Sequence, residues 1–178
     1  EEEKINKILL TSITLSSGKI LQKKFKNNEK VVHQFLPLDI PILINKFLNH
    51  WKPNLSIFID SEIWPTLILQ TNKKKIPLVL LNARITKKTF ERWKLIKKFA
   101  QKIFGKFDLC IASNKESENF LRILGAKNIK NYGNLKYSNS KSSSQKLNLD
   151  FLNKIKNRKI WCATSTHEPE EKICAITH

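Results

Sequence analysis

Two carboxylates stand at the end of an apolar run in the segment FIDSEIWPTLIL, residues 58–69: Asp60 and Glu62. A carboxylate beside a sugar can accept hydrogen bonds from its hydroxyls or act in acid–base chemistry. Trp64 would then give Glu62 an apolar wall. The alternative is structural, since Asp60 or Ser61 could cap the helix that Trp64 begins, and an acid in a first turn suits the helix dipole.

Arg84, in LNARIT, is one of only four arginines among 33 basic residues. A guanidinium offers a planar fork to a carboxylate or phosphate, which a lysine does not. An ion pair with Glu62 or Asp60 is the alternative, and the two roles are compatible. His33, in VVHQFLPLD, lies near the end of another apolar run, where a histidine taken alone is more often structural.

The segment TSTHEPEE, residues 164–171, joins an expected strand to an expected helix. Its backbone amides and hydroxyls make a candidate anion site at a helix N-terminus, with Pro169 early in that helix. Glu170 and Glu171 in the first turn argue against a bare phosphate bound close by.

Apolar runs alternate with helical patterns along the chain, and these elements must position the polar residues. The expected strands are residues 5–14, 30–37, 55–60, 76–83, 107–113, 127–136 and 159–165. The expected helices are residues 16–25 (capped by Ser16 or Ser17), 39–51 (capped by Asp39), 64–74, 86–106 (closed by Gly105) and 114–126 (capped by Ser113 or Asn114 and stopped by Gly125), with a short helix and a final helix on either side of strand 159–165.

The strands are nearly continuous apolar runs, a pattern typical of a parallel sheet with helices on both faces, so the fold class is α/β. The serine-rich segment 138–149 predicts a linker. It would separate a Rossmann-like domain, residues 1–137, from the start of a second, residues 150–178. Ligands of such sheets bind beyond the carboxyl ends of the strands, and the polar residues fall there, so the sequence predicts a cleft.

The net charge is +18 with 40% apolar residues, which indicates a globular, strongly basic protein. The excess lysine is either a solvated surface, partly a product of A/T-biased coding, or an attraction to a phospholipid, a phosphorylated lipid or nucleic acid. Three cysteines without paired spacing indicate reduced thiols in a cytosolic compartment, and no metal site is expected. We see no bilayer-spanning stretch and no signal peptide, and both ends look truncated.

Several motifs, in this order, closely resemble those of the bacterial transferases of 3-deoxy-D-manno-octulosonic acid (Kdo): HQFLPLD, DSEIWP, LNARIT, FDLCIAS, LGAKNIKNYGNLKY and ATSTHEPEE. The resemblance implies a glycosyltransferase-B fold of two Rossmann-like domains. It also implies transfer of Kdo, with inversion and without cofactor or metal, from CMP-Kdo to the phosphorylated glycolipid lipid IVA, the lipid A precursor. This is a step of lipopolysaccharide biosynthesis on the anionic cytoplasmic face of the bacterial inner (plasma) membrane.

The resemblance also implies roles for single residues. Glu62 matches an essential carboxylate, and Arg84, in an Asn-Ala-Arg motif with Asn82, would face the acidic donor or an acceptor phosphate. Donor-binding candidates are Ser165, Thr166 and His167, and further substrate-binding candidates are His33, Ser61 and Lys136. The family's general-base glutamate and its membrane anchor would lie outside this chain, so the fragment is expected to be inactive alone.

Two rival functions remain open. One is another two-domain nucleotide-sugar transferase of cell-envelope synthesis, which would share the architecture. The other, more distant, is a basic nucleic-acid-binding module. Against it, the aromatic residues sit within apolar runs and not among the lysines, and no recognition motif is present, so no nucleic-acid partner is expected.

Overall fold

The computed structural model describes residues 5–135, 156 and 163–177 of the 178-residue chain. The chain divides into two compact units, Glu1–Ser138 and Asn139–His178. The expected linker 138–149 and most of the expected strand 159–165 lie outside the described residues. The division into domains at 137 and 150 therefore stays a prediction.

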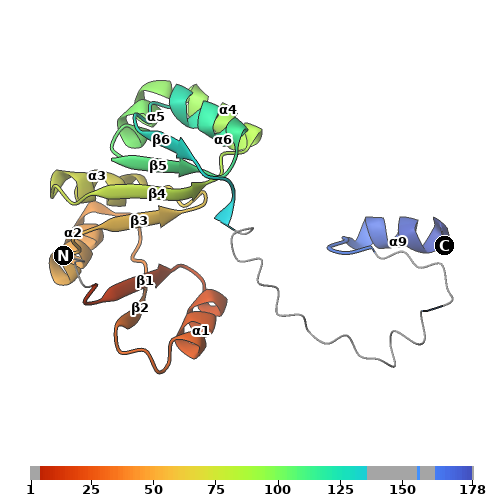
Figure 1. The fold of residues 1–178 in the computed structure, drawn as a ribbon, viewed down its shortest axis with the longest axis horizontal. Coiled ribbons are helices and arrows are strands. Elements are labelled where there is room, and N and C mark those ends of the chain that lie inside the picture. Colours follow the sequence, from red (N-terminus) through yellow and green to blue (C-terminus); the bar gives the residue numbers. More distant parts are fainter. Residues whose placement is uncertain (1–4, 136–155, 157–162, 178) are drawn as a thin grey trace. The chain divides into compact units, whose positions relative to one another are not determined.

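The first unit alternates strands and helices, as expected for the α/β class (Figure 1). In chain order the elements are β1 (Ile8–Ser12), α1 (Leu15–Lys24), β2 (Val31–Phe35), α2 (Pro41–Trp51), β3 (Ser56–Ile59), α3 (Pro65–Lys73), β4 (Leu78–Ala83), α4 (Lys87–Leu95), α5 (Lys97–Phe104), β5 (Leu109–Ala112), α6 (Lys115–Ile123) and β6 (Ile129–Asn131). β1 pairs with β2, and a second sheet has the order β3-β4-β5-β6. Every pairing is parallel, which confirms the predicted Rossmann-like arrangement.

The helix starts differ in part from the expected caps. α1 is capped by Thr14, not by Ser16 or Ser17, because the Thr14 hydroxyl accepts from the Ser17 amide. Asp39 does not cap α2, because the N-cap residue of this helix is Ile40 and no side chain forms a cap bond there. Its carboxylate instead accepts from the amides of residues 66 and 67, at 2.9 and 2.8 Å, and so caps α3 from a distant part of the chain.

Two further expectations concern α3 and α6. The N-cap residue of α3 is Trp64 and carries no side-chain cap bond, so neither Asp60 nor Ser61 caps this helix. α6 is capped by Asn114, whose side chain accepts from the Ser117 amide at 2.8 Å. Gly125 follows α6 with φ +101°, a conformation that favours glycine and stops the helix as predicted.

The single helix expected over 86–106 is two helices. α4 ends at Leu95, Ile96 has φ −116° and ψ 44°, and α5 begins at Lys97. Gly105 closes α5 as expected. Two aromatic contacts hold this break in place, since Trp93 of α4 meets Phe104 of α5 edge-on at 5.3 Å and stacks on Phe99 at 6.3 Å.

The core lies between the four-stranded sheet and its helices. Phe58, Leu80 and Cys110 are adjacent in register and buried, with α3 packed on β4 and α6 on β5 and β6. Side chains alternate between the two faces of a strand, and Ile57 and Ile59 on the opposite face of β3 are 51% and 52% exposed. Burial on both faces, expected from the apolar runs, therefore does not hold for β3.

Candidate active site

The segments that follow β3 and β4 are joined at the carboxyl edge of the sheet. The Asp60 amide donates to the Leu81 carbonyl at 3.0 Å, and the Arg84 amide to the Asp60 carbonyl at 3.4 Å. The Ser61 hydroxyl donates to the Arg84 carbonyl at 2.8 Å. Ser61 and Arg84 are 23 residues apart in the chain. The structure thus brings the DSE and NAR segments together on one rim of the sheet.

Asn82 is the centre of this rim. Its side chain is buried, with 4% of the residue exposed. Its Nδ2 donates to Oδ1 of Asp60, and its Oδ1 accepts from the Leu135 amide at 3.1 Å. One amide group therefore holds three segments together: the end of β3, the end of β4 and the chain that follows β6.

Asp60 and Asn82 also have strained backbone conformations. Asp60 and Asn82 have φ of 58° and 54°, in the left-handed region that non-glycine residues seldom adopt, although Asp and Asn tolerate it best. Lys52 and Lys75 also have positive φ, but both follow the last turn of a helix, where this conformation is common. Strain at neighbouring strand ends that is held by side-chain hydrogen bonds is typical of functional sites.

Glu62 is exposed and oriented by its neighbour. Trp64 Nε1 donates to Glu62 Oε2 at 2.9 Å, and the Glu62 amide donates to the Ile59 carbonyl at 3.2 Å. Trp64 therefore fixes the carboxylate by a hydrogen bond, beyond the apolar wall expected from the sequence. Within the described residues no protein group bonds to Glu62 Oε1, which leaves that oxygen for a ligand.

The Arg84 side chain is exposed on the same rim. Within the part of the chain that the structure describes, it forms no ion pair with Asp60 or Glu62, so the structural alternative for this arginine is not found there. Beside it, at the end of β5, the Ser113 amide donates to the Ala83 carbonyl at 3.0 Å. The buried Ser113 hydroxyl has no hydrogen-bond partner among the described residues.

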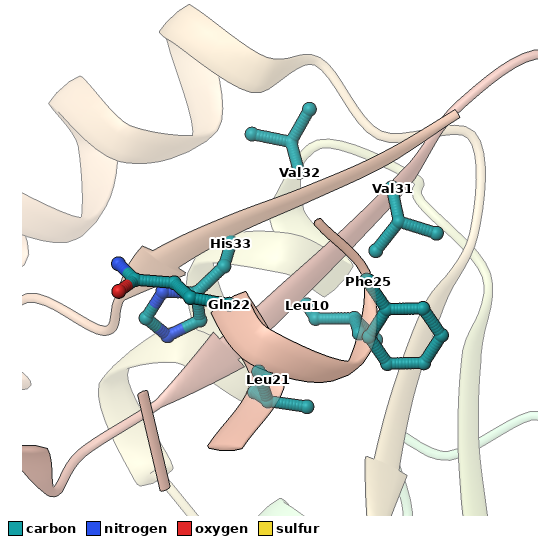
Figure 2. Close-up of a pocket in the computed structure, with 7 residues that line it drawn as sticks. All are labelled: Leu10, Leu21, Gln22, Phe25, Val31, Val32 and His33. Atoms are coloured by element: carbon teal, nitrogen blue, oxygen red, sulfur yellow. The ribbon is translucent and has the colours of Figure 1, made fainter. Parts of the chain in front are cut away.

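His33 lies elsewhere, in the β1–β2 sheet. Its Nε2 and the Ser12 hydroxyl share a hydrogen bond of 2.9 Å, and its ring meets Phe35 edge-on at 5.0 Å. Together with Leu10, Leu21, Gln22, Phe25, Val31 and Val32 it lines a shallow hollow between this sheet and α1. Figure 2 shows His33 and Gln22 at one end of the hollow and Phe25 at the other. The contacts of His33 are those of a packing residue, and its substrate role stays a prediction.

The STH segment belongs to the second unit, where it precedes α9 (Glu168–Thr177). Ser165 also has a left-handed φ, 57°. Glu170 accepts from the His167 amide at 3.0 Å, and the Thr166 hydroxyl donates to Glu171 at 3.3 Å. Carboxylates therefore already occupy the start of this helix. Lys136 lies outside the described residues.

Sequence reasoning missed two residues of α6, one that supports the rim and one that joins the helix to β6. The Ser117 hydroxyl accepts from the Ile85 amide at 3.0 Å, which anchors the chain just after Arg84. The nearly buried Glu118 accepts from Lys115 at 3.1 Å, Arg122 at 3.0 Å and Asn131 at 3.4 Å. The Lys115 and Asn131 hydrogen bonds hold the pKa of Glu118 below its usual value. The spacing of four between Glu118 and Arg122 was the available signal.

Metal-binding and membrane-spanning groups are not found in the described part of the chain. Within residues 5–135, 156 and 163–177, no three His, Cys, Asp or Glu side chains are grouped so as to hold a metal ion. In the same ranges, every helix is too short or too polar to cross a membrane.

Residues 1–139 match the family model described as 3-deoxy-D-manno-octulosonic-acid transferase (kdotransferase). Curated relatives named 3-deoxy-D-manno-octulosonic acid transferase include those of Rickettsia bellii, 39% identical over 94% of this chain and 40% of the relative, and Rickettsia typhi, 38% identical over 94% and 36%. A probable mitochondrial form from Arabidopsis thaliana is 35% identical over 96% and 40%. The chain spans 36–40% of the length of these relatives. It belongs to the 3-deoxy-D-manno-octulosonic acid transferase family.

Proposed function

We propose that the protein containing this chain is a glycosyltransferase that moves Kdo from CMP-Kdo to the lipid A precursor, lipid IVA, with inversion, in lipopolysaccharide biosynthesis. The observation that carries the proposal is the presence of both Glu62 and Arg84 at the carboxyl edge of the same sheet. Both side chains are exposed on one rim of parallel strands, while Asp60, Ser61 and Asn82 between them bond to the protein itself. The match of residues 1–139 to the family model supports the choice of sugar.

The proposed chemistry assigns these two side chains different tasks. Displacement of CMP from the anomeric carbon passes through an oxocarbenium-like state and needs positive charge near the anionic groups. Arg84 provides a fork for the Kdo carboxylate or an acceptor phosphate. Glu62, held by Trp64, accepts hydrogen bonds from sugar hydroxyls through Oε1. The base that activates the acceptor hydroxyl is, in this proposal, a glutamate outside this chain.

Asn82 takes a positioning role in the proposal instead of direct substrate binding. Its Nδ2 and its Oδ1 each already serve a protein partner, Asp60 and Leu135, and the residue is buried. Ser61, whose hydroxyl is bonded to the Arg84 carbonyl, likewise acts mainly on the backbone that carries the guanidinium.

The proposal extends to organisation and place. Residues 1–137 form the acceptor-side domain, residues 138–149 a linker and residues 150–178 the start of the donor-binding domain, where Ser165, Thr166 and His167 approach CMP-Kdo. Lys136 and His33 are weaker substrate-binding candidates. The reaction takes place at the cytoplasmic face of the inner membrane, where the glycolipid acceptor lies.

A donor comparison with the full-length protein tests the function. Lipid IVA is incubated with CMP-Kdo, with a UDP-linked amino sugar or with a nucleotide-linked heptose, and the product mass is measured. Transfer from CMP-Kdo alone is the expected result. Transfer from another donor, with none from CMP-Kdo, would contradict the proposal. Turnover of CMP-Kdo by the 178-residue chain itself would show that the base lies within it.

A further inference from the structure

A dense group of positive charges covers α4 and α5. Between Lys87 and Lys102 there are seven lysine or arginine side chains and a single acid, Glu91, which gives this segment a net charge of +6. All seven basic residues are exposed: Lys87, Lys88, Arg92, Lys94, Lys97, Lys98 and Lys102. Only Lys94 approaches the acid, at 3.8 Å. The charge of the segment is therefore almost uncompensated by its own carboxylates.

Apolar side chains project from the middle of this charge. Leu95 is 86% exposed, Ile96 50% and Phe99 40%. They surround the break between the two helices, where Ile96 leaves the helical conformation. We call these three residues, with the seven basic ones, the α4–α5 corner. In Figure 1 the two helices lie beside α6, away from β1 and β2.

The corner does not depend on Leu95 and Ile96 for its packing, whereas Phe99 stacks on Trp93. The inner face of α4 is held by Phe90, which stacks on Phe120 at 4.2 Å. The inner face of α5 is held by the buried Ala100, Ile103 and Phe104. Leu95 and Ile96 are thus exposed apolar side chains with lysine and arginine residues around them. Only the binding of a partner could remove them from water.

We propose that the α4–α5 corner docks the protein on an anionic lipid bilayer. Leu95, Ile96 and Phe99 would enter the headgroup region, while the lysine stems extend along it and place their ammonium groups on lipid phosphates. A nucleic acid fits less well, because Leu95 and Ile96 have no flat face for a base and Trp93 is already packed between Phe99 and Phe104. The positive charge and the exposed apolar side chains together favour an anionic bilayer over a nucleic acid as the partner.

The α4–α5 corner is also close in the chain to the candidate active site. α4 begins three residues after Arg84, with Thr86 as its cap, so the docking surface is continuous in the chain with the candidate active site. The choice of a lipid surface rests on the proposed function, which requires a membrane glycolipid as acceptor. Vesicle binding is measured without any sugar transfer, so a failure to dock is distinguishable from a failure of Kdo transfer.

Vesicle flotation tests the proposal with the chain itself. Vesicles are made of phosphatidylcholine alone or with added phosphatidylglycerol. Two corner variants are compared with wild type: the triple Lys94→Gln, Lys97→Gln, Lys98→Gln and the double Leu95→Ser, Ile96→Ser. Matched controls on α1 and the turn that follows it are the triple Lys23→Gln, Lys24→Gln, Lys26→Gln and the double Leu15→Ser, Ile20→Ser, which also change exposed lysines and exposed apolar residues. Circular dichroism confirms that each variant is folded.

Wild type is expected to bind the anionic vesicles and not the neutral ones. The corner triple should lose on the order of a hundredfold in partition coefficient, because each surface lysine at an anionic membrane contributes about a factor of five. The corner double should lose about tenfold or more. Each α1 control should lose less than about threefold at physiological salt, because α1 lies outside the proposed docking surface, where apolar residues stay in water and lysines are screened.

Three results would overturn the proposal. The α1 controls could lose as much as the corner variants, which would make the attraction a property of total charge. Wild type could bind neutral vesicles equally well. Or it could bind single-stranded RNA, added as the alternative polyanion, with no binding to anionic vesicles.

Discussion

Replacement of Asn82 tests the clamp that defines the rim. Asn82→Ala removes the hydrogen bond to the Asp60 carboxylate and the one from the Leu135 amide. A bond to a charged group contributes about 1.5–3 kcal/mol and a neutral one about 1 kcal/mol. Alanine at φ 54° also loses the local tolerance of asparagine for this conformation, about 1 kcal/mol. The free energy of unfolding should therefore fall by about 3.5–5 kcal/mol.

Asn82→Gly separates the two contributions. Glycine loses the same hydrogen bonds but adopts a left-handed φ freely, so after its larger unfolded-state entropy is counted it should be about 0.5–1 kcal/mol more stable than the alanine variant. Urea unfolding of the chain, followed by tryptophan fluorescence and circular dichroism, measures both. Asn119→Ala, on the exposed face of α6, is the control and should change stability by less than about 0.5 kcal/mol. An alanine variant more stable than the glycine variant would refute the strain argument, and a loss below about 1 kcal/mol for both would refute the clamp.

Three further predictions follow from single contacts. Burial raises the pKa of Cys110 to about 12, so iodoacetamide at neutral pH should alkylate Cys174 and spare Cys110 in the folded chain; equal labelling of the two peptides would contradict this. The pKa of Glu118 is lowered chiefly by its Lys115 hydrogen bond, so its charge stabilises the fold at neutral pH and that contribution is lost as the pH falls below its ordinary value of 4.5. The stability gap between wild type and Glu118→Gln should shrink there, and a constant gap in urea titrations would argue against the role. Asp39→Ala should cost about 1–2 kcal/mol through the lost cap of α3, and an unchanged unfolding midpoint would show that the cap is dispensable.

The strands and the rim were predictable because both depend on the residue types within short segments of the sequence. Continuous apolar runs such as IPLVLLNA predicted buried parallel strands, and β4 is one. Polar residues directly after those runs predicted one edge, since parallel strands end on the same side. The hydrogen bonds that join Asp60, Ser61 and Arg84 bear out that DSE and NAR meet.

What the sequence did not show depends on contacts between distant residues. Asp39 precedes α2 and was expected to cap it, but it caps α3 because its carboxylate reaches the free amides there. The break at Ile96 interrupts a segment with unbroken helical propensity, and tertiary contacts of Trp93 accompany it. The double role of the Asn82 side chain depends on where Leu135 returns, 53 residues later. A periodic pattern of apolar residues in the sequence does not predict such a long-range contact.

The exposed carboxylate of Glu62 is the centre of the functional proposal, and one kinetic measurement tests it most directly. Kdo transfer to lipid IVA is measured by mass spectrometry for the full-length protein carrying Glu62→Gln, with Glu29→Gln, another exposed glutamate, as the matched control. We expect kcat/KM to fall about tenfold or more for Glu62→Gln, with folding unchanged, because glutamine offers the sugar hydroxyls a neutral acceptor in place of a charged one. The control should transfer Kdo like wild type. A Glu62→Gln protein with kcat/KM within about twofold of wild type would contradict the role of this carboxylate.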